Sequence, residues 1–294
     1  MKIVKLMGGL GNQMFQYAFG KALERKSGGK VLFDNLWFSE VKNATEGGIV
    51  REYGLNLFPI APNFATKEQI EPYISKNKLK RMWLKLLGCG GKYVREYKNP
   101  QYNGEYLKIK SNAYYKGYFQ CPKYFENIAG EIRKDFTFLP IPADDAFNQK
   151  WLKRFSECEN PVFIHLRRGD YAGLGWVLPL EYYQKAVAEI KKRVKNPTFF
   201  VFGSECDDYI EKEFDIGVPF EVVGEENARN KEDWKDIVLM MNCKHAIIAN
   251  STFSWWAAWL SDVDGRTIVA PMPFTTNDDI LPDNWLRIKR TENI

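Results

Sequence analysis

Pro161-Val162-Phe163-Ile164-His165-Leu166-Arg167-Arg168-Gly169-Asp170 is the stretch that decides the fold, because a short, mainly apolar run ends there in charged and turn-forming residues. Such a run predicts a buried strand at 161–166. Amphipathic and apolar segments alternate regularly after it, which predicts a doubly wound parallel sheet. The predicted helices are 180–194, 207–214, 232–242 and 253–261, and the further predicted strands are 198–203, 220–223, 245–249 and 266–270.

The start of the chain has a similar βαβ pattern. An apolar run at 3–7 leads through glycines into a helical stretch at about 12–26, and a strand is predicted at 30–33. Residues 36–120 show no sustained period, so long loops and short helices are expected there in no predicted order. The segment 139–143 has the composition of a linker. We therefore expect an α/β protein with Rossmann-like domains at 1–150 and 151–294.

Composition excludes several classes of protein. The net charge of +5 suits an anionic substrate but lacks the dense basic stripe of a nucleic-acid binder. Five cysteines without a Cys-x-x-Cys pair argue for a reducing compartment and against a disulfide frame or zinc site, and two histidines argue against a histidine-based metal site. The chain shows neither a signal peptide nor a membrane-spanning apolar run, so a cytoplasmic protein is expected.

The two arginines at the end of strand 161–166 are the sharpest chemical signal. Ligands of open α/β sheets gather at the carboxyl ends of strands. The guanidinium groups of Arg167 and Arg168 offer planar, permanently charged donors to a diphosphate and can offset charge on a departing nucleotide. Many Arg-Arg pairs are solvated surface charge, but the position between His165 and Asp170 favours a functional pair.

A second signal lies at the strand-to-helix junction Asn250-Ser251-Thr252-Phe253-Ser254-Trp255-Trp256. Hydroxyls and backbone N–H groups at a helix start form an anion site. The alternative is simple N-capping by Ser251 or Thr252 with Trp255, Trp256 and Trp259 in the core, and both interpretations can hold together.

The third signal is Gly8-Gly9-Leu10-Gly11-Asn12-Gln13-Met14-Phe15-Gln16. Met14 stands where a dinucleotide fingerprint has its third glycine, which weakens an NAD-binding interpretation. Gly9 and Gly11 would still let a ligand approach the backbone, and Asn12 and Gln13 place amides at the helix start.

In this order the three stretches resemble the inverting α-1,2-fucosyltransferases of glycosyltransferase family 11, from about residue 3 to residue 272. The resemblance implies a GT-B fold of two facing Rossmann-like domains. The first would serve the acceptor and the second would bind GDP-fucose, with no metal or other cofactor. It implies a glycan as the acceptor, namely a galactoside whose 2-hydroxyl receives the fucose. Catalytic roles are expected for Arg167, Asn12 and Asp170, and donor contacts for Gly9, Gly11, Gln13, His165, Arg168, Asn250, Ser251, Thr252, Phe253 and Ser254.

The general base stays open in this scheme. Asp170 is a candidate, but its carboxylate could equally hold the guanine or orient the arginines. Asn12 cannot act as a base at neutral pH and could position the attacking hydroxyl. Two other functions also stay open: transfer of a different sugar from a nucleotide donor, and carbohydrate binding without catalysis.

Other features have plainer explanations. Asp262-Val263-Asp264 is better explained as a turn than as a metal motif, and His245 as a residue completing local hydrogen bonds. The basic segment 76–98 could be a membrane-surface helix, but a solvated basic face of the acceptor domain is expected instead, so that the segment is not a membrane anchor and any attachment of the protein is at most peripheral, at the inner membrane face.

Overall fold

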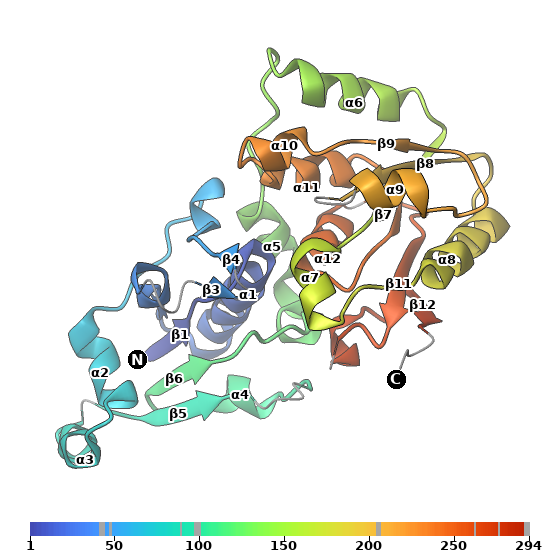
Figure 1. Ribbon diagram of the computed structural model, residues 1–294. Coiled ribbons are helices and arrows are strands. Elements are labelled where there is room, and N and C mark those ends of the chain that lie inside the picture. Colours follow the sequence, from blue (N-terminus) through green and yellow to red (C-terminus); the bar gives the residue numbers. More distant parts are fainter. Residues whose placement is uncertain are drawn as a thin grey trace. The chain divides into compact units, whose positions relative to one another are not determined.

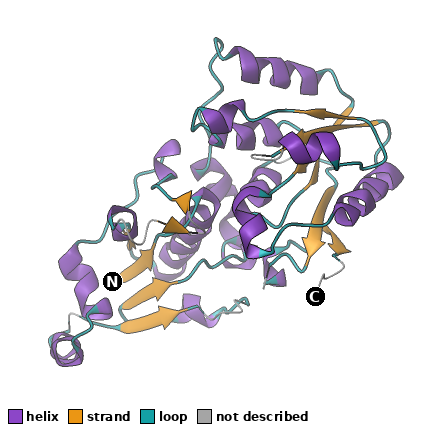
Figure 2. Ribbon diagram, in the orientation of Figure 1, coloured by secondary structure: helices purple, strands orange, loops and turns teal. Residues whose placement is uncertain are grey.

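The computed structural model describes residues 1–40, 45–46, 49–88, 90–96, 101–203, 207–261, 263–275 and 277–290. The chain forms two compact units, Met1–Thr137 and Phe138–Ile294. Each is built around a parallel sheet with helices packed on it (Figure 1, Figure 2). The predicted α/β class with two Rossmann-like units is confirmed.

The first unit has a parallel four-stranded sheet in the order β2-β1-β6-β5. Helix α1 packs on one face and α2 on the other, where Ile3 and Tyr114 of the sheet meet Ile70 and Tyr73. Strands β3 and β4 form a separate antiparallel pair. The strands are β1 (Lys2–Lys5), β2 (Val31–Asp34), β3 (Thr45–Glu46), β4 (Ile49–Val50), β5 (Lys92–Arg95) and β6 (Ala113–Lys116), and the helices are α1 (Leu10–Ser27), α2 (Lys67–Ile74), α3 (Lys78–Leu86), α4 (Glu105–Lys108) and α5 (Ala129–Asp135).

The second unit has a parallel six-stranded sheet in the order β12-β11-β10-β7-β8-β9. Counted within the unit, this is the 3-2-1-4-5-6 order of a Rossmann sheet, and its topological switch point lies between β7 and β10. The strands are β7 (Asn160–His165), β8 (Pro197–Phe202), β9 (Phe220–Val222), β10 (His245–Ile247), β11 (Ile268–Met272) and β12 (Leu286–Lys289), and the helices are α6 (Ala146–Ser156), α7 (Gly169–Leu174), α8 (Leu180–Arg193), α9 (Asp207–Lys212), α10 (Glu226–Arg229), α11 (Trp234–Met241) and α12 (Thr252–Leu260).

Alternate residues of the second sheet face two helical layers. Val162 and Val201 pack with α8 in one cluster, whereas Phe200 meets the rings of Trp151 and Phe155 from α6. The division between the units falls after Thr137, where the Phe138 ring stacks on Trp234 of α11 at 5.9 Å. The predicted boundary after residue 150 therefore falls inside α6, a helix of the second unit.

Helix α3 carries most of the basic segment, and its surface is not the purely basic one that was predicted for a solvated face. Lys78 and Lys80 are exposed as expected, but apolar residues beside them are exposed as well, including Trp83 at 61% and Leu86 at 78%. Among the described residues, no helix is long and apolar enough to cross a membrane.

Cys121 and Cys243 are buried thiols and Cys158 is a half-buried one, whereas Cys89 and Cys206 lie outside the described residues.

Close packing of α1 on β2 depends on a glycine. A Cβ atom added at Gly20 would stand 2.6 Å from the ring of Phe33, closer than Cβ atoms of folded proteins come to a non-bonded neighbour. Gly20 therefore lets the helix lie directly on the strand.

We predict that Gly20→Ala destabilises the first unit by about 1–3 kcal/mol, because the helix or the Phe33 ring must shift. Gly130→Ala is the matched control in α5, since a Cβ there meets nothing within 4 Å. The control should be neutral or stabilising by up to about 1 kcal/mol. Urea unfolding followed by circular dichroism measures both, and a Gly20→Ala protein as stable as the control would contradict the packing argument.

Candidate functional site

The carboxyl ends of β7 and β10 bring two of the sequence signals together. The strands pair in parallel with Ile164 opposite Ile247, so the chain after His165 runs beside the chain that leads to Asn250. Helix α12 begins directly after this second segment. The arginine pair and the Asn250–Ser254 junction therefore share one edge of the sheet, at the switch point.

The two arginines have different neighbours. The Arg167 guanidinium lies 5.4 Å from the ring centroid of Tyr171 in α7, whereas that of Arg168 lies only 3.6 Å over the ring of Tyr209 in α9. Stacking at this distance gives Arg168 a fixed packing role. Tyr171 in turn faces the junction before α12, so Arg167 is the arginine associated with the switch point.

Tyr171, Trp176 and Asn250 connect α7 to that junction. The Tyr171 hydroxyl donates to the carbonyl oxygen of Asn250 at 3.3 Å, and Asn250 Nδ2 donates to the carbonyl oxygen of Trp176 at 2.9 Å. The Tyr171 and Trp176 rings meet edge to face at 5.6 Å. Oδ1 of Asn250 is buried without a hydrogen-bond partner among the described residues, so it is an acceptor still to be satisfied.

His165 is a neutral residue under this edge. Its ring lies 5.8 Å from that of Phe253, and its carbonyl oxygen accepts from the Tyr183 hydroxyl at 3.2 Å. Burial, and then the positive charge of Arg167, lower the pKa of His165 to about 3. Nδ1 is buried and has no partner within the described part of the chain. His165 thus offers an uncharged ring nitrogen rather than a cation.

The start of α12 combines capping with an open backbone end. The Ser251 hydroxyl accepts from the Phe253 N–H at 3.3 Å, so Ser251 is the N-cap. Ser254 is fully buried, and its hydroxyl donates to the Ser251 carbonyl oxygen within the same turn. Trp255 and Trp256 are core residues, as the capping interpretation expects. Thr252 and Phe253 are half-buried at the first turn, where helix N–H groups favour an anion.

Asp170 lies in the first turn of α7, and its side chain is outside the described part of the structure.

In the first unit, two glutamine amides hold the glycine loop after β1. Gln13 Nε2 donates to the carbonyl oxygens of Gly8 and Glu52, and its Oε1 accepts from the Gly54 N–H, all at 2.9 Å. Gln16 accepts from the Met7 N–H. We expected Gln13 to contact the donor, but its side-chain amide bonds backbone groups of the protein instead. The left-handed residue of the loop is Gly8, with φ +79°, while Gly9 is extended and Gly11 is buried in α1.

A second loop, 117–120, contacts this one, and no pattern in the sequence predicts it. The half-buried Glu96 carboxylate accepts from the N–H groups of Tyr118 and Phe119 at 2.7–3.1 Å. Burial raises the pKa of Glu96. Gln120 Nε2 then donates to Asn12 Oδ1 at 2.8 Å, so the oxygen end of the Asn12 amide faces this loop. Glu96 and Gln120 therefore set how Asn12 is oriented at the sheet edge.

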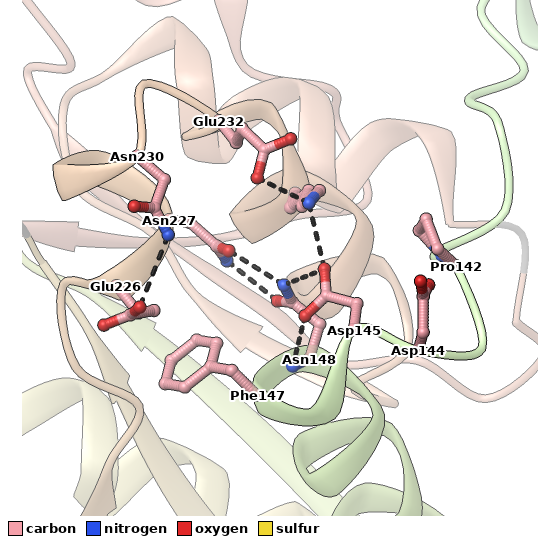
Figure 3. Close-up of a pocket in the computed structure, with 10 residues that line it drawn as sticks. Pro142, Asp144, Asp145, Phe147, Asn148, Glu226, Asn227, Asn230 and Glu232 are labelled. Atoms are coloured by element: carbon pink, nitrogen blue, oxygen red, sulfur yellow. Dashed lines mark hydrogen bonds and ion pairs between the residues drawn. The ribbon is translucent and has the colours of Figure 1, made fainter.

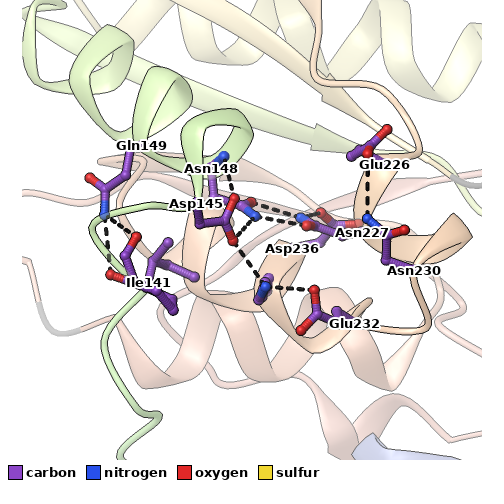
Figure 4. A network of polar contacts seen from close by, with 11 residues as sticks. Ile141, Asp145, Asn148, Gln149, Glu226, Asn227, Asn230, Glu232 and Asp236 are labelled. Atoms are coloured by element: carbon purple, nitrogen blue, oxygen red, sulfur yellow. Dashed lines mark hydrogen bonds and ion pairs between the residues drawn. The ribbon is translucent and has the colours of Figure 1, made fainter.

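A polar hollow of about 320 Å³ lies elsewhere in the second unit, between α6 and the α10–α11 segment (Figure 3). Its side chains mostly bond one another: Asp145 accepts from Lys235 at 2.9 Å, and Asn148 exchanges two hydrogen bonds with Asn227 (Figure 4). Asn227 also donates to Asp236, whose pKa burial raises to about 7. These bonds give the cluster a structural role, that of fastening α6 to α11.

The remaining sequence features follow their plainer interpretations. His245 Nδ1 accepts from the Thr267 N–H at 3.0 Å, a local bond as predicted. Asp264 and Gly265 form a turn before β11, while Asp262 lies outside the described residues. Where the structure describes the side chains, no group of three or more His, Cys, Asp or Glu could hold a metal ion.

Comparison with known proteins gives a family match. The family model described as Glycosyl transferase family 11 matches residues 74–289. The chain is 32% identical to an alpha-1,2-colitosyltransferase of Escherichia coli, over 98% of this chain and 99% of that protein. It is 29% identical to the O-antigen biosynthesis glycosyltransferase WbnK of Escherichia coli, over 96% and 99%. It is 25% identical to the galactoside 2-alpha-L-fucosyltransferase Sec1 of Mus musculus, over 90% and 65%.

We predict that both histidines stay neutral down to about pH 5, since the pKa values of His165 and His245 are lowered to about 3 and about 4, mainly by burial. An unfolded histidine titrates near pH 6.5, so the stability these groups contribute is complete above about that pH and is lost as the pH falls toward 4 and 3. The chain has only two histidines, so NMR titration of the ring Cε1–H signals reads each directly. A signal that titrates near pH 6.5 in the folded protein would contradict the buried, neutral His165.

Proposed function

This chain belongs to glycosyl transferase family 11, and on that premise we propose that it transfers L-fucose from GDP-fucose to a sugar hydroxyl, with inversion and without a metal ion. The observation that most supports this proposal is that Arg167 and the start of α12 both follow strands at the β7–β10 switch point. A fixed cation and a helix N-terminus side by side suit the diphosphate of a nucleotide sugar.

The reaction would be a single in-line displacement. The acceptor oxygen forms a bond to the anomeric carbon while the bond from that carbon to the β-phosphate oxygen breaks. GDP leaves with the electron pair, and the hydroxyl proton passes to a base. Arg167 and the α12 N–H groups would stabilise the negative charge that grows on the leaving phosphate. We retain Asp170 as the candidate base.

The other residues would bind and orient. The neutral His165 and the unsatisfied Oδ1 of Asn250 are complementary to a ligand that both donates and accepts hydrogen bonds, as a guanine or a ribose does. Arg168 would support the donor site through its stack on Tyr209, and Thr252 and Phe253 would flank the diphosphate. Asn12, held by Gln120, would orient the acceptor hydroxyl, and Gly9 would leave room for it, whereas Gly11 is buried in α1.

The names of the relatives support the sugar and the acceptor. A mouse relative is called a galactoside 2-alpha-L-fucosyltransferase, which favours the 2-hydroxyl of a galactoside as acceptor. A second candidate donor carries colitose, because the 32% identical Escherichia coli relative is called an alpha-1,2-colitosyltransferase. Colitose is L-fucose without the hydroxyl at C3, so both donors present the same phosphate and anomeric carbon to the site.

We predict that the protein releases GDP from GDP-fucose only when a galactoside acceptor is present, and equally fast in EDTA and in magnesium. Arg167 and the helix start would supply the positive field that a metal supplies elsewhere. The assay measures GDP with methyl β-galactoside and with its 2-deoxy analogue as control. A loss of about tenfold or more on chelation would reject the metal-free mechanism. A strong preference for the colitosyl donor in the same assay would replace fucose as the sugar.

We predict that Arg167→Ala lowers kcat by about 10²–10³-fold with a smaller effect on donor binding, because its charge acts mainly on the transition state. Arg167→Lys should recover only part of the rate, since it keeps the charge but loses the bidentate fork. Arg193→Ala, a surface arginine paired with Glu189 at the end of α8, is the matched control.

Circular dichroism should accompany these kinetic measurements, since loss of a half-buried charge can unfold a domain. A folded Arg167→Ala protein with normal kcat and a raised KM would make Arg167 a uniform binding residue.

A further inference from the structure

Helix α3 is built with a defined start and end. The Asn77 side chain accepts from the Lys80 N–H at 3.0 Å, which caps the first turn. The Leu87 N–H bonds the Trp83 carbonyl oxygen, and Gly88 ends the helix with a left-handed φ of +74°. A helix of nine residues is marginal by itself, so it gains most of its stability by burying an apolar face.

The apolar face of α3 is not buried within this chain. Leu79, Met82, Trp83 and Leu86 follow the i, i+3, i+4, i+7 spacing of one helical stripe, and they are 73%, 58%, 61% and 78% exposed. Leu87 extends the stripe at 56% exposure. Contiguous exposed apolar side chains of this kind mark an interaction surface.

A different side of the helix is attached to the first unit. Lys80 Nζ pairs with Glu71 of α2 at 2.6 Å, and Leu84, one turn further along, is half-buried. Figure 1 shows α3 beyond the end of α2, at the periphery of the first unit. The exposed stripe is therefore held in place by a packed side and remains open to a partner.

The charge beside the stripe indicates which partner fits. Lys78 and Arg81 are exposed next to it, and the sequence holds no acidic residue from Lys76 to Arg95. Apolar side chains that include a tryptophan, bordered by cations, are complementary to a bilayer whose surface is anionic and whose interior is apolar.

We propose that α3 docks the protein onto an anionic membrane surface, with Leu79, Met82, Trp83 and Leu86 entering the headgroup boundary and Lys78 and Arg81 meeting lipid phosphates. The lysine and arginine stems can lie along the boundary while their charges stay in water. The surface lies on one unit and contains no residue of the proposed transfer site. It therefore goes beyond the proposed function and does not depend on it.

Vesicle co-sedimentation tests the surface with the full chain. At about 0.15 M salt, the protein should pellet with phosphatidylcholine vesicles that contain about one-third phosphatidylglycerol, and not with phosphatidylcholine alone. Leu79→Ser/Trp83→Ser should lower the partition coefficient at least about tenfold by removing the inserted groups. Lys78→Glu/Arg81→Glu should do the same by reversing the charge.

Two matched variants control for exposure and net charge. Leu139→Ser changes an exposed leucine outside α3, and Lys191→Glu/Lys195→Glu makes the same charge change at exposed positions of the second unit. Both should bind like the unchanged protein, and circular dichroism should show all four variants folded. Failure of the unchanged protein to pellet with anionic vesicles would overturn the proposal. Equal vesicle binding by Leu79→Ser/Trp83→Ser and the unchanged protein would also overturn it. So would a third result: the unchanged protein does not bind vesicles but self-associates in sedimentation velocity, and Leu79→Ser/Trp83→Ser abolishes that self-association.

Discussion

The parallel pairing of β7 with β10 is the constraint on which the rest of the second unit depends. These strands are separated by more than 75 residues of sequence, and their register alone brings the chain after His165 beside the chain before α12. The register also decides which arginine belongs to the edge. The Arg167 guanidinium lies near the ring of Tyr171, whose hydroxyl bonds the Asn250 carbonyl oxygen, whereas that of Arg168 stacks on Tyr209 of α9. Two consecutive residues of the same type thereby have distinct environments.

In the first unit, uncharged amide side chains rather than charged groups hold the glycine loop at the edge of the sheet. The side-chain amides of Gln13 and Gln16 hydrogen-bond backbone groups of the loops around α1, and Gln120 bonds Asn12 from a separate loop. Glu96 is the one ionisable group in this set, and it holds loop 117–119 through backbone N–H groups. A polar side chain at a sheet edge can thus serve the backbone rather than a ligand, and only the bonds it makes distinguish the two.

Sequence reasoning could predict what local periodicity determines. The strands of residues 160–272 and the helices α8, α9, α11 and α12 were predicted to within about two residues, because each is a short apolar or amphipathic run between turn signals, whereas the short helices α7 and α10 were missed. Helix α6 was missed and the domain boundary was put inside it, since Phe138 joins the second unit by a stack on a residue almost a hundred positions away. The contacts of Glu96, Gln120 and Tyr209 could not be predicted either, because they join segments with no shared pattern. The exposure of Trp83 and its neighbours was missed for a related reason: periodicity locates an apolar stripe but not what covers it.

Gly20 sets more than the packing of one helix. An α-helix is stiff over two turns, so α1 moves as a rod, and Asn12 lies about 12 Å along its axis from the point of closest contact with Phe33. The height of the helix above β2 therefore fixes the height of its first turn above the edge of the sheet. The absence of a side chain at Gly20, in the core, thus sets the position of Asn12 and of the glycine loop before it, about two helical turns away.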